Sequence, residues 1–307
     1  MSKKILIVGT IAYDAIETPF DKVTRILGGS CPYIALAASK FSNDCSIISV
    51  IGKDFENKDL EILKKNNINC DGIKKDIQSN TFFWSGKYSH DMNSRTTLET
   101  KLNVLDKFNP IIDKINLKPE ILIIGNLDPN IQLDVLNQIK SRPKFILLDT
   151  MNIWIQNFRN TLEKIIPNVD LLSLNDEEAR LLSGENSLFK AADKILEMGI
   201  EYLIIKKGEH GCMFFSNNKL FIIPSYPTNK TKDPTGAGDT FAGGIAGFLS
   251  NQDIINFETI KQSILYGTIL ASFTVESFGI KSLLDVTKFD LNKRLNHFKL
   301  LTSFYGH

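Results

Sequence analysis

The sequence predicts an α/β fold: a doubly wound, mostly parallel sheet flanked by helices, with a small β-sheet lid. Short apolar runs alternate with helical patterns along the chain. The runs lie at residues 4–8, 45–51, 121–124, 145–148, 169–174 and 202–205, and the helical patterns at 35–41, 60–66, 131–139 and 191–198. The runs are continuously apolar, which indicates strands covered on both faces, as in a parallel sheet.

One region, residues 73–104, departs from this alternation. It alternates polar and apolar residues and is rich in Thr, Phe, Trp and Tyr, so residues 82–88 and 95–100 are predicted as strands around a loop. Together with residues 11–27 they would form the lid. We expect residues 1–307 to form a single domain that carries this lid.

Composition narrows the class of partner. The 36 basic and 35 acidic residues leave a net charge of +1, and no basic run is interleaved with aromatic residues, so a nucleic-acid surface is not predicted. No stretch approaches the roughly 20 apolar residues that span a membrane, and the first nine residues are predicted as a strand, not a signal peptide. The cysteines are scattered, which argues against a zinc site or disulfide framework: Cys31, Cys45, Cys70 and Cys212. We expect a cytoplasmic protein.

Polar or glycine residues follow five of the apolar runs. They are Gly9, Gly125, Asp149, Asn175 and Lys206. Ligands of open parallel sheets bind at the carboxyl ends of the strands. The sequence therefore predicts a polar crevice along one edge of the sheet.

The most informative stretch runs from residue 233 to residue 244. Two glycines, Gly236 and Gly238, permit close approach to the main chain, and a helix of small residues follows. The unpaired N–H groups of such a helix start attract phosphate. Asp239 among those donors is interpreted as a general base beside a transferring phosphoryl group. The alternative is that Asp239 only complements the helix dipole.

Residues 233–246 resemble the second signature of the ribokinase-like (PfkB) sugar and nucleoside kinases, and the resemblance extends over nearly the whole chain. It implies that the backbone of Gly236, Ala237 and Gly238 forms an anion hole and that Asp239 deprotonates the acceptor hydroxyl group. It also implies ATP as phosphate donor and Mg²⁺ as cofactor. No Walker-type P-loop or dinucleotide-binding glycine motif competes with this interpretation, and the four histidines are dispersed.

The resemblance places substrate-binding residues near the N-terminus. Gly28 and Gly29 resemble the first signature, and Asp14 stands where the family binds substrate hydroxyl groups. Tyr33 stands where most relatives carry a sugar-binding Asn. The sequence Gly28-Gly29-Ser30 also predicts a loop with Ser30 as the N-cap of a helix.

Two more segments resemble the nucleotide and metal sites of the family. Asn175 and Glu178 match a motif that orders Mg²⁺ through water, although the same spacing predicts a capping box. The turn with Lys206, Gly208 and Gly211 would contact the nucleotide, or would simply be a hairpin loop. Residues 272–279, starting at Ser272, would close the adenine pocket. The same segment would help to form a K⁺-binding loop, in which backbone carbonyl groups of Asp233 and Thr235 are further ligands.

The sequence thus favours an ATP-dependent kinase that transfers the γ-phosphate to a hydroxymethyl group of a small sugar. A nucleoside kinase of the adenosine or inosine type is the alternative, because Phe82, Phe83 and Trp84 would either cover a base or pack on the sheet. A non-catalytic sugar- or nucleotide-binding regulator on the same fold is a third possibility. The partner would be a small molecule, and in this family the lid edge often pairs in a homodimer.

Overall fold

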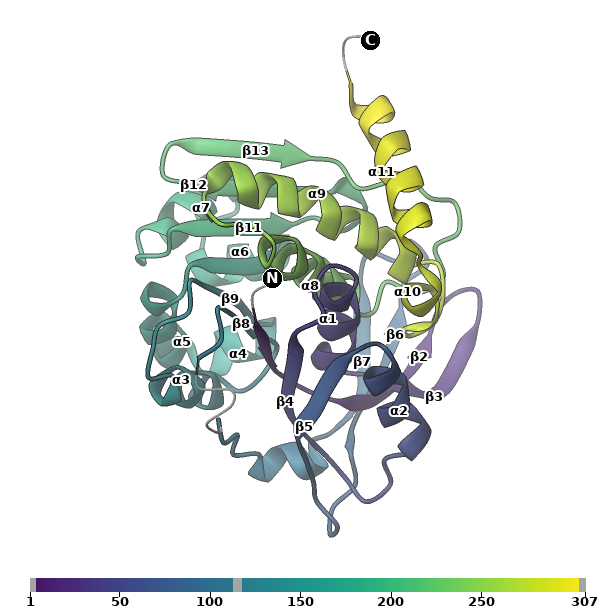
Figure 1. Ribbon diagram of the computed structural model, residues 1–307. Coiled ribbons are helices and arrows are strands. Elements are labelled where there is room, and N and C mark those ends of the chain that lie inside the picture. Colours follow the sequence, from purple (N-terminus) through teal and green to yellow (C-terminus); the bar gives the residue numbers. More distant parts are fainter. Residues whose placement is uncertain (1–3, 113–117, 304–307) are drawn as a thin grey trace.

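The computed structural model describes residues 4–112 and 118–303, so Met1–Lys3 at the start of the first predicted strand lie outside it. A nine-stranded sheet forms the centre, in the order β13-β12-β11-β10-β9-β8-β1-β4-β5 (Figure 1). Its strands are β1 (Ile5–Val8), β4 (Cys45–Ile51), β5 (Ile68–Lys75), β8 (Ile121–Ile124), β9 (Phe145–Asp149), β10 (Leu171–Asn175), β11 (Tyr202–Lys206), β12 (Cys212–Ser216) and β13 (Lys219–Ile223).

The predicted parallel sheet is confirmed. Strands β5, β4, β1, β8, β9, β10 and β11 run parallel, and β12 and β13 add an antiparallel edge. Each of the six apolar runs forms a strand, and the carboxyl ends of β9, β10 and β11 lie side by side. Asp149, Asn175 and Lys206 end these three neighbouring strands.

Helices cover both faces of the large sheet, as a doubly wound fold requires. One apolar core joins the sheet to α1 (Ser30–Ser39), α2 (Asn57–Lys65), α8 (Ala237–Leu249), α9 (Phe257–Thr274), α10 (Lys281–Asp285) and α11 (Lys288–Thr302). A second core joins the other face to α3 (Pro129–Gln138), α4 (Asn152–Asn157), α5 (Arg159–Ile165), α6 (Asp176–Ser183) and α7 (Leu188–Leu196). None of the helices in the described ranges is long and apolar enough to cross a membrane.

The lid is a separate four-stranded sheet in the order β3-β2-β6-β7. It consists of β2 (Ala12–Glu17), β3 (Lys22–Gly28), β6 (Phe82–Tyr88) and β7 (Arg95–Lys101), and Figure 1 shows β2, β3 and β6 together at the lower right. Its second segment is shorter than the predicted range 73–104. Residues up to Lys75 belong to β5 of the large sheet, and Asn103–Lys107 form a short 3₁₀ helix, η1.

Helix α1 begins earlier than the helical pattern at residues 35–41 indicated. Gly29 is the residue before its first turn, so the prediction of Ser30 as N-cap is wrong. The Ser30 hydroxyl group instead accepts a hydrogen bond from the Thr10 N–H group at 3.0 Å, which joins the helix start to the end of β1.

Small residues let α8 pack closely between α1 and α9. A Cβ atom on Gly243 would lie 2.2 Å from the Ile34 carbonyl oxygen, and one on Gly244 would lie 2.8 Å from the Gly267 Cα atom. Such distances leave no room for a side chain at either position. Gly243 and Gly244 therefore let α8 lie close to α1 and α9, which in turn determines where the start of α8 lies.

Candidate active site

A turn at residues 233–236 leads into α8 and shapes its N-terminus. The Asp233 carboxylate accepts a hydrogen bond from the Thr235 N–H group at 2.9 Å. Gly236 follows with a φ of 77°, in the left-handed region that favours glycine. A Cβ atom there would also lie 2.4 Å from the Tyr33 ring, so both conformation and space require glycine at this position.

The first N–H groups of α8 provide donors for an anion. The Ala237 N–H group donates to the Pro234 carbonyl group at 3.2 Å, so it is engaged within the turn. The N–H groups of Gly238 and Asp239 have no backbone acceptor among the described residues. Among the described residues, the N–H groups of Gly238 and Asp239 are thus free to bind an anion, whereas the Ala237 N–H group would have to leave the Pro234 carbonyl group to join them.

Asp239 lies beside these donors, in the first turn of α8. Its Oδ1 atom is buried and has no hydrogen-bond partner among the described residues. Burial and the charge of Asp149 raise the pKa of Asp239 to about 7, against the opposing charges of Lys206 and Arg95. A carboxylate with a buried, unused acceptor oxygen and a pKa near neutrality is suited to accept a proton.

Lys206 is a half-buried cation at the edge of the predicted anion hole. Its Nζ atom lies 3.1 Å from Asp149 Oδ1 and would lie 3.3 Å from a Cβ atom placed on Gly238. Burial alone would lower the pKa of Lys206, but the negative charges of Asp149, Glu178 and Asp239 outweigh it and raise the pKa. Lys206 is therefore a permanent positive charge among three carboxylates.

Glu178 stands next to this cation, at the start of α6. The predicted capping box is present: the Asn175 N–H group donates to Glu178 Oε2 and the Glu178 N–H group donates to Asn175 Oδ1, both at 2.7 Å. Burial raises the pKa of Glu178 to about 7, with a smaller opposing effect of Lys206 and a further increase from Asp149. The helix start thus delivers a carboxyl group to the crevice.

Asp14 of β2 approaches the same centre from the lid. A Cβ atom on Gly28 would lie 1.9 Å from Asp14 Oδ2, and Gly29 has a φ of 82°. Burial and the charges of Asp233 and Asp239 raise the pKa of Asp14 to about 7, while a hydrogen bond from the Gly29 N–H group lowers it. Gly28 therefore makes room for this carboxylate, and the Gly29 N–H group donates to it.

Tyr33 lies under the turn that precedes α8. Its residue is 1% exposed, and its hydroxyl group has no hydrogen-bond partner among the described residues. Burial and then the charges of Asp14, Asp233 and Asp239 raise the pKa of Tyr33 well above its ordinary value. Its phenol thus lies buried between the turn before α8 and Asp14.

Two lid residues that the sequence analysis did not single out also reach the site. Tyr88 Oη lies 2.9 Å from Thr235 Oγ1, which joins β6 to the turn before α8. Arg95 of β7 lowers the pKa values of Asp14, Glu178 and Asp239 by its charge. The alternation along residues 82–88 could have predicted the face to which Tyr88 projects, because every second residue of a strand lies on the same face.

The turn between β11 and β12 is a hairpin connection that also contacts the lid. Gly208–His210 form a 3₁₀ turn, η3, and a Cβ atom on Gly211 would lie 2.0 Å from the Ile223 carbonyl oxygen. The Asn93 side chain of the lid donates to Glu209 Oε1 at 2.9 Å. The loop between β6 and β7 therefore spans from the lid to this turn.

Ser272 faces α11 in this structure. Its hydroxyl group donates to the Ile269 carbonyl group at 2.6 Å and accepts a hydrogen bond from Arg294 at 3.0 Å. The Val275 carbonyl group, one turn later, accepts hydrogen bonds from the N–H groups of Lys232 and Asp233. This segment thus supports the turn before α8 from behind.

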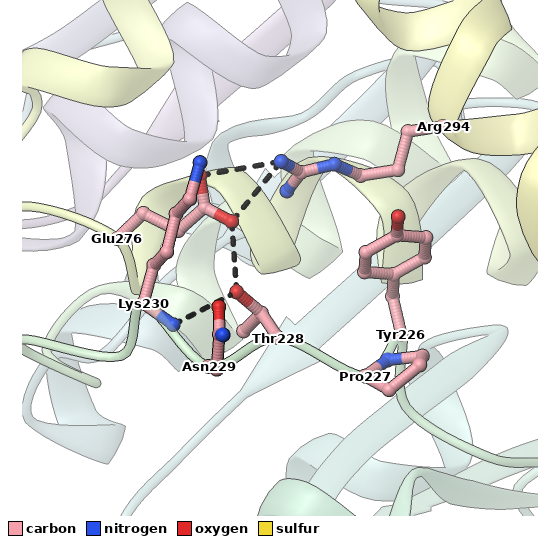
Figure 2. Close-up of a pocket in the computed structure, with 7 residues that line it drawn as sticks. All are labelled: Tyr226, Pro227, Thr228, Asn229, Lys230, Glu276 and Arg294. Carbon is pink, nitrogen blue, oxygen red and sulfur yellow. Dashed lines mark hydrogen bonds and ion pairs between the residues drawn. The ribbon is translucent and has the colours of Figure 1, made fainter.

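A polar pocket of about 520 Å³ opens behind that support (Figure 2). Arg294 binds Glu276 at 3.0 Å, Glu276 accepts a hydrogen bond from Thr228 at 2.9 Å, and the Arg294 guanidinium lies 3.5 Å from the Phe273 ring centroid. Since these charged groups satisfy one another, we assign the pocket no ligand. It is lined by Tyr226, Pro227, Thr228, Asn229, Lys230, Glu276 and Arg294.

Comparison with known proteins gives relatives that are kinases. The chain is 24% identical over 251 residues to the cytidine kinase of Thermococcus kodakarensis, covering 80% of this chain and 88% of the relative. It is 26% identical over 275 residues to the nucleoside kinase of Methanocaldococcus jannaschii, covering 84% and 82%. The crystal structure of a Methanocaldococcus jannaschii nucleoside kinase, a ribokinase-family member, matches with a TM-score of 0.76 at 25% identity over 97% of this chain and 100% of that one.

A structure of lower sequence identity has the same fold. A putative ribokinase II from E. coli, solved in complex with ATP and Mg²⁺, matches with a TM-score of 0.78 at 19% identity, over 96% of this chain and 99% of that one. The pattern that defines the pfkB family carbohydrate kinases matches residues 2–286. This chain therefore belongs to the pfkB family of carbohydrate kinases, and is a phosphotransferase with an alcohol group as acceptor.

Proposed function

We propose that this protein transfers the γ-phosphate of ATP to a hydroxymethyl group of a small sugar or a nucleoside, with Asp239 as general base. The observation that carries this proposal is the unpartnered, buried Oδ1 atom of Asp239 beside the free N–H groups of Gly238 and Asp239. A hydroxyl group that donates to this carboxylate would have its oxygen next to the anion hole. Phosphoryl transfer needs this combination of a proton acceptor and donors for the developing charge.

The acceptor would lie between the lid and the end of the large sheet. Asp14 would accept hydrogen bonds from its hydroxyl groups, and the backbone at Gly28 and Gly29 would lie against its ring. Tyr33 supplies a buried phenol in the same space, whose hydroxyl group is available to the acceptor. Closure of the lid over the acceptor would exclude water, which otherwise competes as an acceptor for the phosphoryl group.

The triphosphate would lie along the ends of β10 and β11. Lys206 would contact the phosphates, the turn with Gly208 and Gly211 would border the nucleotide, and residues from Ser272 onward would support its pocket. Asn175 and Glu178 fit a hydrated Mg²⁺, because oxygen ligands suit this ion and Glu178 presents a buried carboxyl group to the crevice. Held by these residues, the ion would offset negative charge on the phosphate groups during transfer.

A monovalent cation also fits the turn before α8. Asp233 is fully buried, and its Oδ2 atom has no hydrogen-bond partner among the described residues. An unpartnered buried oxygen of this kind is costly unless it meets a cation or a proton. We propose that K⁺ lies there, with backbone carbonyl groups at Asp233 and Thr235 as further ligands.

A panel of sugars and nucleosides, each incubated with the protein, ATP and Mg²⁺, tests the proposal by ADP release. We expect at least one acceptor to give phosphorylated product in a one-to-one ratio to ADP. A regulator on the same fold would instead bind panel members, as seen by a shift in melting temperature, without forming ADP. That outcome would overturn the proposed activity.

A further inference from the structure

Trp84 lies on the face of the lid that looks toward the catalytic residues. Parallel strands β2 and β6 pair Asp14 with Trp84, and residues paired in this way project to the same face. Tyr88, four residues farther along β6, shares that face and bonds Thr235 in front of α8. Phe83 projects to the other face, where its ring lies 5.6 Å from Lys101 Nζ.

The Trp84 side chain lies flat along its own strand. A Cβ atom on Gly86 would lie 2.2 Å from a carbon of the indole ring, so the ring occupies the space that a side chain at residue 86 would fill. The indole N–H group donates to Thr97 Oγ1 at 3.3 Å, and the Arg95 guanidinium carbon lies 5.5 Å from the ring centroid. Trp84 nevertheless stays partly exposed. One edge of the ring is thus tethered while part of it remains open.

This arrangement places an aromatic surface one strand away from the carboxylate that would bind the ring hydroxyl groups of the acceptor. Neighbouring strands are about 4.8 Å apart, which is close to the distance between a ribose ring and its attached base. A simple sugar bound at Asp14 has no flat group to lay on the indole. A nucleoside has one.

We propose that Trp84 is a stacking platform for the base of the acceptor, and that the acceptor is therefore a nucleoside. This inference rests on the proposed kinase activity and names its substrate class. The only hydrogen-bond donor of the indole already bonds Thr97. Trp84 would therefore stack on the flat face of a base and form no hydrogen bond to its edge. Trp84 thus selects for the presence of a base and does not by itself distinguish cytosine from adenine.

The alternative is that the indole only shields the backbone at Gly86 from water. Both explanations predict a fixed ring, so the test must measure the acceptor and not the stability of the lid. Phe83 supplies a matched control, because it is an aromatic residue on the same strand whose side chain projects to the opposite face, where it packs against the apolar core.

Fluorescence measures base binding without turnover. The chain has two tryptophans, Trp84 and Trp154, so the Trp154→Phe variant leaves Trp84 as the only fluorescent indole. We expect cytidine or adenosine to quench this fluorescence in a saturable manner, and ribose at the same concentrations to leave it unchanged. Equal responses to ribose and to both nucleosides would overturn the platform.

Kinetics of Trp84→Ala, Trp84→Phe and Phe83→Ala, measured by ADP release, test the same point under turnover. Base–aromatic stacking leads us to expect a KM for the nucleoside raised on the order of 10-fold or more in Trp84→Ala. Trp84→Phe should recover most of this loss, and Phe83→Ala should leave the KM within about twofold of the wild-type value.

The panel separates failure of this inference from failure of the proposed activity. ADP release with ribose or fructose but with no nucleoside would refute the platform and leave the kinase in place. An unchanged nucleoside KM in Trp84→Ala would show that the indole only covers Gly86. No ADP with any acceptor would reject the proposed activity itself, whatever the fluorescence shows.

Discussion

Asp239 is the residue on which the proposed chemistry depends most directly. Asp239→Asn keeps the shape of the side chain and its place at the helix start, but removes the proton acceptor. We expect kcat to fall by on the order of 10² to 10⁴, the usual contribution of a general base. ATP affinity should persist, because the free donors at Gly238 and residue 239 are backbone groups. A variant with more than about a tenth of wild-type turnover would show that Asp239 is not the base.

The same substitution has a predictable effect on stability. Because the pKa of Asp239 is raised to about 7 in the folded protein, the folded state holds a proton that the unfolded state loses near pH 4. This group therefore destabilises the protein progressively as pH rises from about 4 to 7. Asp239→Asn should melt close to the wild-type temperature at pH 4.5 and above it at pH 8. Thermal melts of the ligand-free proteins at both values check the sign.

Lys206 contributes a fixed positive charge beside the anion hole. Lys206→Met should lower kcat by on the order of 10², comparable to the loss of one donor from an oxyanion site. Lys207→Met is the matched control, since the next residue along the chain has no contact with Asp149 among the described residues. Similar kinetics for the two variants, once both are shown to be folded by circular dichroism, would contradict a specific role for Lys206.

At the scale of elements, the capping box at the start of α6 serves two purposes that one substitution separates. Glu178→Gln keeps an oxygen that can accept from the Asn175 N–H group and loses only the charge. We therefore expect the Mg²⁺ concentration for half-maximal activity to rise several-fold. The melting temperature should be no lower than that of the wild type, and higher at pH 8, because the pKa of Glu178 is also raised to about 7 in the folded protein. If instead the melting temperature fell and the Mg²⁺ requirement stayed the same, Glu178 would be only a capping residue; a Mg²⁺ titration at saturating ATP and thermal melts distinguish the two outcomes.

Most elements of the parallel sheet were predictable because both faces of each strand are buried, so continuous apolar runs mark them. Strand β5 escaped prediction because it is an edge strand with exposed residues on one side. The turn of the β12–β13 hairpin contains Asn217 and Asn218, and Asn217 has a φ of 44°. A pair of this kind is typical of a hairpin turn and could have predicted these two strands. The start of α1 was predicted to within one residue, because Ser30 was expected as its N-cap and Gly29 takes that position.

The site was predictable in its composition but not in its contacts. The resemblance to a kinase signature supplied Asp239, Glu178 and Asp14, since each lies in a short motif. The side chains of Tyr88 and Thr235 form a hydrogen bond although they are 147 positions apart in the sequence. The face of the lid to which Trp84 projects depends on the register between β6 and β2. No local pattern contains such information, because pairing between distant strands is decided by the packing of the whole fold.

At the scale of the whole molecule, the lid is held over the crevice at two points of the β6–β7 hairpin. Tyr88 bonds Thr235 in the turn before α8, and Asn93 bonds Glu209 at the turn after β11. The first bond is partly buried and the second is exposed, so solvent competes mainly for the second. The Tyr88 bond should therefore contribute more to keeping water away from the transferring group.

Tyr88→Phe removes this bond, together with the contact of the hydroxyl group with Arg95, and keeps the buried ring. A net contribution of roughly 0.5–1.5 kcal/mol per hydrogen bond implies a lid that is open several times more often. We expect ATP hydrolysis without acceptor to rise relative to phosphoryl transfer, and the acceptor KM to rise several-fold, while ATP affinity stays unchanged. Asn93→Ala, which removes the exposed bond, should alter this ratio less. The measurement is ADP formed with and without acceptor for the three proteins, and an unchanged ratio in Tyr88→Phe would mean that the lid excludes water without help from its bond to Thr235.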